Sequence, residues 1–183
     1  EKGRTLPAQA PREEKAPPSA ESESKKLSFD EQVSRYFEKR RYADVVYLIN
    51  REKASLEEGK PYRRYYAESL AGMKAEAVSL IAQGEYEKAG KLLLNLKAAL
   101  AGKEDVGKEA GVTAQEVEES IDLCARKLME GGLAEYREGN LGLAIQKWKK
   151  ILTFLPDHRE AKRAIELATV QMKNLKKLEE EKE

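Results

Sequence analysis

Apolar residues recur at helical spacing from Leu27 almost to the end of the chain, and this periodicity is its strongest constraint on fold. Phe29, Val33 and Tyr36, for example, fall on one face of a helix. No segment alternates apolar and polar residues with period two, which argues against β-strands. Ala, Leu, Glu and Lys dominate, and only 7% of residues are aromatic, which favours helices. The sequence therefore predicts an all-α domain over residues 27–183, with about seven helices.

Turn and capping residues mark where the expected helices begin and end. Pro61 suits the first turn of a helix because its missing N–H needs no partner there. Thr113 and Glu116 form a capping-box pattern that opens a long helix through Glu138. Residues 102–112 contain three glycines and charges of both signs, and they predict a loop inside the domain, either mobile or a rigid insertion.

The first 26 residues differ in composition from the rest of the chain. They hold four of the six prolines, and Leu6 is their one large apolar residue, so they predict a disordered, Pro-rich linker. A spacer of this kind, opening at Glu1 and not at Met, suits a domain held away from a membrane after an upstream signal peptide is removed. An arbitrary expression boundary fits equally well. We therefore expect a bacterial periplasmic or cell-envelope protein, such as a lipoprotein, whose membrane contact comes only through an upstream anchor; the alternative is a cytoplasmic protein.

Charge and residue counts exclude several chemistries. Lys and Arg number 34 against 33 Asp and Glu, a balance that argues against a specific nucleic-acid binder. The single cysteine, Cys124, and the single histidine, His158, leave no intrachain disulfide and no zinc site of ordinary ligand count. Cys124 lies on an apolar stripe, and His158 lies where a helix is expected to start. We expect no enzyme activity, cofactor or metal, and no apolar run approaches the ~20 residues that span a bilayer.

Two stretches of the chain share one pattern of small, turn and large apolar residues. Placing Gly84 on Gly139, 55 residues later, superimposes Ala77 on Gly132 and Ala89 on Ala144. A small residue in the first helix of a pair lets the second helix approach closely, and the turn glycine joins them. The remaining matches are Tyr86 on Leu141, Leu93 on Trp148 and Leu96 on Ile151.

This pattern resembles the tetratricopeptide repeat (TPR) family. Leu128 to Pro156 is similar to one complete repeat, although Gly131 stands where the family prefers Leu. Residues 70–101 resemble a degenerate repeat, residues 29–57 a weaker one, and residues 159–178 the helix that closes such arrays. The resemblance implies an irregular α-solenoid of antiparallel helix pairs that acts as a protein-binding scaffold.

The family's groove positions give the candidate site. The resemblance implies that the first helix of each pair lines a concave groove that is apolar at its centre and basic at its rim. Such a groove suits an amphipathic helix or an extended peptide with acidic residues. The groove residues so implied are Lys74, Val78, Ile81, Arg126, Met129, Leu133, Tyr136, Arg137, Arg163, Leu167 and, at the next turn, Val170. The alternative is that the chain's own helices cover the apolar members.

Two other features leave further functions open. Tyr62 to Tyr66 is the densest aromatic and basic cluster, and interleaved Arg and Tyr can stack bases, bind phosphates or form a protein hot spot. We expect instead that Tyr62 and Tyr66 pack inward and that the arginines between them are solvated. The final helix carries Ala161, Ile165, Ala168, Met172 and Leu175 at heptad spacing. The leading interpretation is a non-enzymatic module that binds another protein in its groove. The alternative is a structural protein that assembles into homo-oligomers through its groove or final helix.

Overall fold

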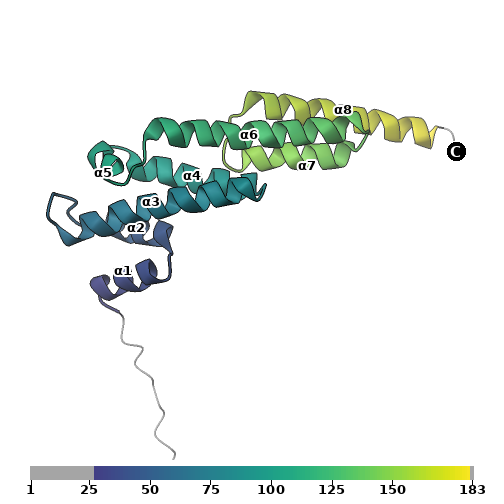
Figure 1. Ribbon diagram of the computed structural model, residues 1–183. Helices are drawn as coiled ribbons and strands as arrows, with labels where there is room; N and C mark the ends of the chain where they lie inside the picture. Colours follow the sequence, from purple (N-terminus) through teal and green to yellow (C-terminus); the bar gives the residue numbers. More distant parts are fainter. Residues whose placement is uncertain (1–26, 182–183) are drawn as a thin grey trace, which may run out of the picture.

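The computed structural model describes residues 27–181, and the predicted linker 1–26 lies outside them. The described part contains eight helices and no strand, so the prediction of an all-α fold is confirmed (Figure 1). The helices are α1 (Phe29–Glu38), α2 (Tyr42–Arg51), α3 (Pro61–Ala82), α4 (Tyr86–Leu100), α5 (Glu104–Glu109), α6 (Ala114–Arg137), α7 (Leu141–Leu152) and α8 (Arg159–Glu180). The predicted capping box opens α6, where Glu116 N–H donates to the Thr113 hydroxyl.

Three helix pairs, α1–α2, α3–α4 and α6–α7, are joined by turns of one design. Arg40, Gly84 and Gly139 occupy the same place in these turns and have positive φ values of 55°, 75° and 85°. In each turn this residue's N–H donates to the carbonyl three residues back, and the next N–H donates to the carbonyl five residues back. That pattern satisfies the last carbonyl groups of the first helix and reverses the chain.

Arg40 adopts a backbone conformation that costs an L-residue about 1–2 kcal/mol. We expect Arg40→Gly to raise the free energy of unfolding by about 1 kcal/mol, measured by urea denaturation. The matched change in the opposite direction, Gly84→Ala, should lower it by a similar amount. A destabilised Arg40→Gly variant would show that the positive φ of Arg40 is not a source of strain.

Glycines let aromatic rings pack directly on helix backbone at three junctions. Gly132 of α6 lies under the Trp148 ring of α7, and a Cβ there would overlap the ring. Gly72 of α3 lies under the Tyr42 ring in the same way, and a Cβ on Gly90 would come within 2.8 Å of the Phe154 ring. The role predicted for Gly132, a small residue that allows close helix approach, is therefore confirmed.

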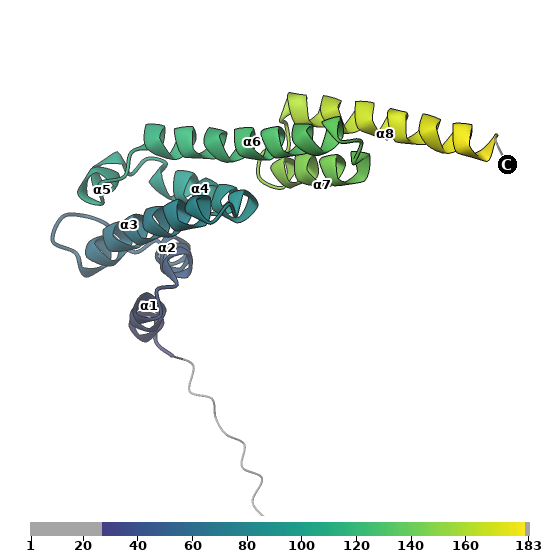
Figure 2. The same ribbon diagram turned by 45° about the vertical axis from the view of Figure 1, so that its right-hand side comes forward.

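The pairs form an elongated array in which α6 is the longest helix (Figure 1, Figure 2). The α3–α4 pair lies along the N-terminal half of α6, where Lys97 of α4 forms an ion pair with Glu118 at 2.9 Å. Helices α7 and α8 lie along the C-terminal half, and α8 then continues beyond the ends of both α6 and α7. The second and third pairs are therefore offset along the axis of α6.

Residues 102–112 were expected to form a loop, but Glu104–Glu109 form helix α5 and the segment packs on the core, as a rigid insertion would. Val106 and Val112 are buried in the apolar interior beside Leu100. Arg63 of α3 fixes the outer side of α5 by ion pairs of 2.8 Å with Asp105 and 2.7 Å with Glu109. The two buried valines, each next to a glycine, supply the packing that the high glycine content of the segment did not indicate.

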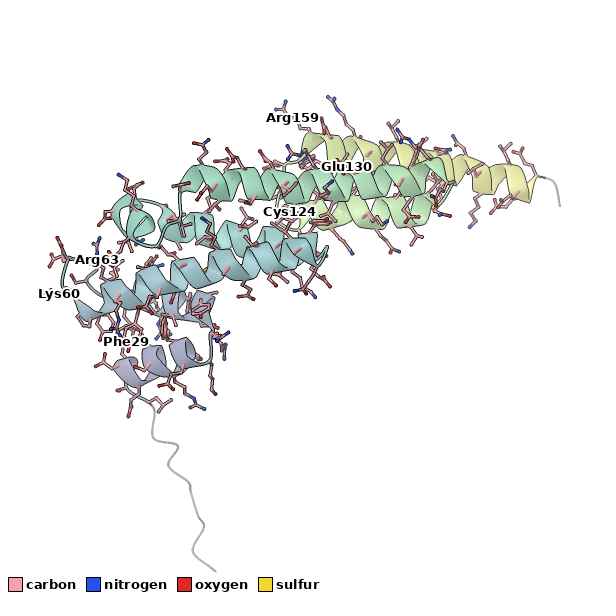
Figure 3. The ribbon with its side chains drawn as sticks, in the orientation of Figure 1. Phe29, Lys60, Arg63, Cys124, Glu130 and Arg159 are labelled. Carbon is pink, nitrogen blue, oxygen red and sulfur yellow. The ribbon has the colours of Figure 1, made fainter. Side chains whose placement is uncertain are left out.

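Arg63 also corrects the expectation that both arginines of the aromatic cluster are solvated. Its side chain is only 16% exposed, and it also donates to the Leu56 carbonyl at 2.9 Å. Figure 3 shows its position beside the start of α3, near α5. The hydrogen bond from Arg63 lowers the pKa of the Asp105 carboxyl. Arg64, in contrast, is exposed and pairs within its own helix with Glu68.

We expect Arg63→Ala to release α5 from α3. Amide hydrogen exchange across residues 104–112 should become about tenfold faster or more, because two ion pairs and a backbone contact are lost together. Arg64→Ala is the matched control and should leave exchange in this segment unchanged. Equal effects of the two changes would mean that Arg63 does not hold α5.

Candidate functional site

The candidate groove residues fall into two separate groups. Lys74, Val78 and Ile81 lie on α3, alongside the N-terminal half of α6. Lys74 is bonded to residues around the start of α6: its ammonium donates to the Gly111 carbonyl at 2.9 Å and to the Glu116 carboxylate at 3.0 Å. The hydrogen bond from Lys74 lowers the pKa of the Glu116 carboxyl.

The offset between the second and third pairs explains this separation. The C-terminal half of α6, which carries Leu133, Tyr136 and Arg137, extends beyond the end of α3 (Figure 1, Figure 2). Val78 is exposed and Ile81 is half-buried, but both belong to the α3 side of the array. The structure therefore does not bring the three α3 residues together with the distal residues of α6.

Helices α6 and α8, in contrast, bring their candidate residues together. The Tyr136 hydroxyl of α6 donates to the side-chain carbonyl of Gln171 of α8 at 2.5 Å. At the other end of this contact, Arg126 and Met129 of α6 line a hollow of about 360 Å³ together with Glu160 of α8. The two helices thus run side by side from the start of α8 to Gln171.

Exposed apolar side chains and arginines make up the surface that results. Leu133 is 41% exposed and Leu167 is 67% exposed, and Val170 is also exposed. We call this the α6–α8 surface, and its members are Arg126, Met129, Leu133, Tyr136, Arg137, Arg163, Leu167 and Val170. Arg126, Arg137 and Arg163 are exposed and have no ion-pair partner within residues 27–181. The surface therefore offers apolar contact area beside three available cations.

Tyr136 anchors this surface to the interior. Its ring lies 6.0 Å from the Trp148 ring, at an angle of 41°, and is half-buried. The Trp148 indole N–H donates to the Met129 carbonyl at 3.3 Å, which ties α7 to the backbone of α6. Met129 itself is partly buried against the core. Since Gly132 admits the Trp148 ring, the shape of the surface depends on the packing beneath it.

The aromatic residues from Tyr62 to Tyr66 serve packing. Tyr66 is fully buried, as expected, and its hydroxyl donates to the Ala99 carbonyl at 3.0 Å. Burial raises the pKa of this hydroxyl. Tyr62 is half-buried, donates to Asp30 and packs against Phe29 with ring centroids 5.1 Å apart. Tyr62 packs on α1 and Tyr66 is buried and bonded to α4, so the two rings do not form one exposed platform on which bases could stack.

The single histidine and the single cysteine both have structural roles: His158 caps a helix and Cys124 is buried in the core. The His158 ring accepts the Ala161 N–H at Nδ1, at 3.1 Å, so it caps the start of α8 where a helix start was expected. Cys124 is fully buried, and burial raises the pKa of its thiol to about 11. Among residues 27–181, no group of three or more His, Cys, Asp or Glu is arranged to hold a metal ion. No helix in the same range is both long and apolar enough to cross a membrane.

Gln171 and Glu160 are site residues that the sequence prediction did not include. The signal that gave Leu167 could have given both: the TPR resemblance implies an offset of 34 residues, which leads from Leu133 to Leu167, from Arg126 to Glu160 and from Arg137 to Gln171. Comparisons with known proteins add no relative: no family model, curated protein or solved structure matches this chain.

Proposed function

We propose that the protein is a non-enzymatic binding module that holds a helix or extended peptide of another protein on its α6–α8 surface. The observation that carries the proposal is the exposure of Leu133, Leu167 and Val170 beside three arginines that lack ion-pair partners within the described residues. Exposed apolar groups in a patch with a polar rim are typical of protein interaction sites.

The chemistry of the surface favours an acidic, amphipathic partner. Apolar side chains of the partner would bury Leu133 and Leu167, each contributing about 1.5–3 kcal/mol when fully removed from water. Its carboxylates would form charge-assisted, bidentate hydrogen bonds with arginines such as Arg137 and Arg163. The basic rim would also steer an acidic segment toward the surface before contact.

We also propose that the array is of the tetratricopeptide-repeat type. The three identical turns at Arg40, Gly84 and Gly139 support this, since a repeat family reuses one turn for every pair. The packing of Trp148 on Gly132 supports it in the same way. A solved crystal structure that placed α6 and α7 in a different pairing would overturn the proposal.

The cellular setting is a separate proposal. The Pro, Ser, Glu and Lys content of residues 1–26 supports a spacer that holds the module off a membrane in the bacterial cell envelope, as part of a lipoprotein. Fractionation of the source cells tests this. Recovery of the protein with the envelope is the expected result, and recovery with the cytoplasm would support the alternative.

A peptide-display selection tests binding. Random 16-residue peptides are selected for binding to the immobilised full chain. The affinity of each selected peptide is then measured by fluorescence anisotropy. The double variant Leu133→Asp, Leu167→Asp should bind these peptides with an affinity lower by about a hundredfold or more, because two central apolar contacts become carboxylates that repel an acidic ligand. The control is Leu143→Asp on α7, a leucine that is 50% exposed outside the α6–α8 surface. An equal loss with the control variant would contradict the proposal.

A further inference from the structure

A pocket lies between α2 and α4, on helices that take no part in the α6–α8 surface. Its volume is about 260 Å³, which is below the range of about 300–1,000 Å³ typical of small-molecule sites. This size suits a few side chains of a peptide better than a cofactor. The lining residues are Ala43, Val46, Tyr47, Asn50, Met73, Asn95, Ala98 and Ala99. A role for this pocket is independent of the proposed function.

The pocket favours an uncharged ligand. None of its lining residues is charged, although 37% of the residues in the chain are. Val46, Met73 and Ala99 are buried and give it an apolar floor. Its amide groups belong to Asn50 and Asn95, which are both exposed. A charged side chain that entered would lose hydration and find no opposite charge in the lining.

Tyr47 adds an aromatic surface to this pocket. Tyr47 is 63% exposed, whereas every other Phe, Tyr and Trp of the described part is at least partly buried. The neighbouring Asn50 amide is held in place, because it donates to the Tyr66 hydroxyl at 3.0 Å. Grooves lined by aromatic side chains bind polyproline II segments, whose carbonyl groups have no partner within the segment and can accept from an amide.

The chain itself contains a short sequence that fits this pocket. Ala16–Ala20 reads Ala-Pro-Pro-Ser-Ala, an uncharged stretch between Lys15 and Glu21. Consecutive prolines favour the polyproline II conformation. Thr5–Pro11 is also uncharged, but its two prolines stand at opposite ends of Pro-Ala-Gln-Ala-Pro. Only the stretch 16–20 therefore offers two adjacent proline rings.

The position of α1 brings this stretch within reach of the pocket. Helices α1 and α2 form an antiparallel pair, so the start of α1 lies beside the end of α2, close to Asn50 (Figure 1, Figure 2). The seven residues from Ala20 to Leu27 span about 22 Å as polyproline II, roughly twice the diameter of a helix. A tether this short gives an effective concentration on the order of millimolar, so even a weak contact is occupied.

We propose that residues 16–20 dock in the pocket between α2 and α4 as a polyproline II segment. Its proline rings pack on Tyr47, and the Asn95 amide donates to one of its carbonyl groups. The docked stretch fastens the N-terminal segment across the first two helix pairs.

Nuclear magnetic resonance of the full chain tests the docking. A nitroxide label is attached at Ser22→Cys, since the natural Cys124 is fully buried. We expect the label to weaken the Asn95 side-chain signal about twofold or more, because docking holds the label beside the pocket. Adding Pro17→Glu with Pro18→Glu should restore the signal, since two carboxylates would have to enter an uncharged pocket.

The matched control carries Pro7→Glu with Pro11→Glu, the same chemical change outside the docked stretch. It should keep the weakened Asn95 signal. The proposal is overturned if the label leaves the Asn95 signal unchanged in the natural segment. It is equally overturned if the two pairs of proline changes have the same effect.

Two further changes test the pocket itself. Tyr47→Ala should also restore the Asn95 signal, and the fold is retained because Tyr47 is exposed. Leu143→Ala on α7 is the control and should leave the signal weakened. A free peptide with the sequence of residues 15–22 is then added in excess, and we expect it to displace the label. If this peptide shifts the Asn95 signal while the label has no effect, the pocket binds a Pro-rich segment of another protein and the proposal is overturned.

Discussion

Replacing Gly132 by alanine should lower the free energy of unfolding by about 2 kcal/mol, although it adds only one methyl group. The new Cβ would overlap the Trp148 ring, which is only 3% exposed. Moving the ring would also lengthen the hydrogen bond from its indole N–H to the Met129 carbonyl. Urea denaturation followed by Trp148 fluorescence measures the change, since Trp148 is the single tryptophan.

The adjacent glycine is the matched control for this prediction. A Cβ on Gly131 would lie 3.5 Å from the nearest atom, the Cδ of Lys147, which is ordinary contact. Gly131→Ala should therefore raise the free energy of unfolding by about 0.5–1 kcal/mol, because alanine is the better residue inside a helix. If both variants were more stable than the natural protein, the Trp148 ring of α7 would not lie directly on Gly132 of α6.

Removing the Phe154 ring should have the largest effect, a loss of about 3–5 kcal/mol in the free energy of unfolding. Phe154 is 1% exposed and follows α7, yet its ring packs on Gly90 of α4. The adjacent Thr153 hydroxyl donates to Glu87 of α4 at 3.3 Å. The ring is therefore a main contact between the second and third helix pairs, and Phe154→Ala leaves a cavity at that junction.

The effect of Gly90→Ala should change sign with the residue at position 154. In the natural background its methyl would lie 2.8 Å from the Phe154 ring, so we expect a loss of about 1–3 kcal/mol. In the Phe154→Ala background the ring is gone, and the same change should stabilise by about 0.5–1 kcal/mol. A double-mutant cycle by urea denaturation measures both values. Equal effects in the two backgrounds would show that the ring does not lie on Gly90.

The sequence was informative wherever one residue type met a local physical requirement. Gly84 and Gly139 were identifiable as turn residues because a positive φ favours glycine, and the Thr113 capping pattern located the start of α6. The equivalent first turn has Arg40 in place of glycine, so only the polar break around Arg40 between two apolar stripes indicated it. The α5 helix was missed because it is held by packing on Leu100 and by ion pairs with Arg63, which is distant in sequence.

The candidate site could be predicted only within a regular stretch of the array. Arg126, Leu133 and Leu167 are brought together because α6 and α8 run side by side, with Tyr136 bonded to Gln171. Lys74 does not lie with these residues, because α5 and the extended start of α6 shift the third pair along the axis of α6. That shift depends on the length and packing of an insertion, and no periodic pattern specifies it.

Site-specific photocrosslinking in the source cells most directly tests whether the α6–α8 surface is where a partner binds. A photoreactive phenylalanine analogue replaces Leu133, Leu167 or Leu143, one at a time, all exposed leucines of the third pair or α8. We predict one adduct of the same mass from positions 133 and 167, and none from position 143. An adduct from position 143 alone, or none from positions 133 and 167, would contradict the proposed binding surface.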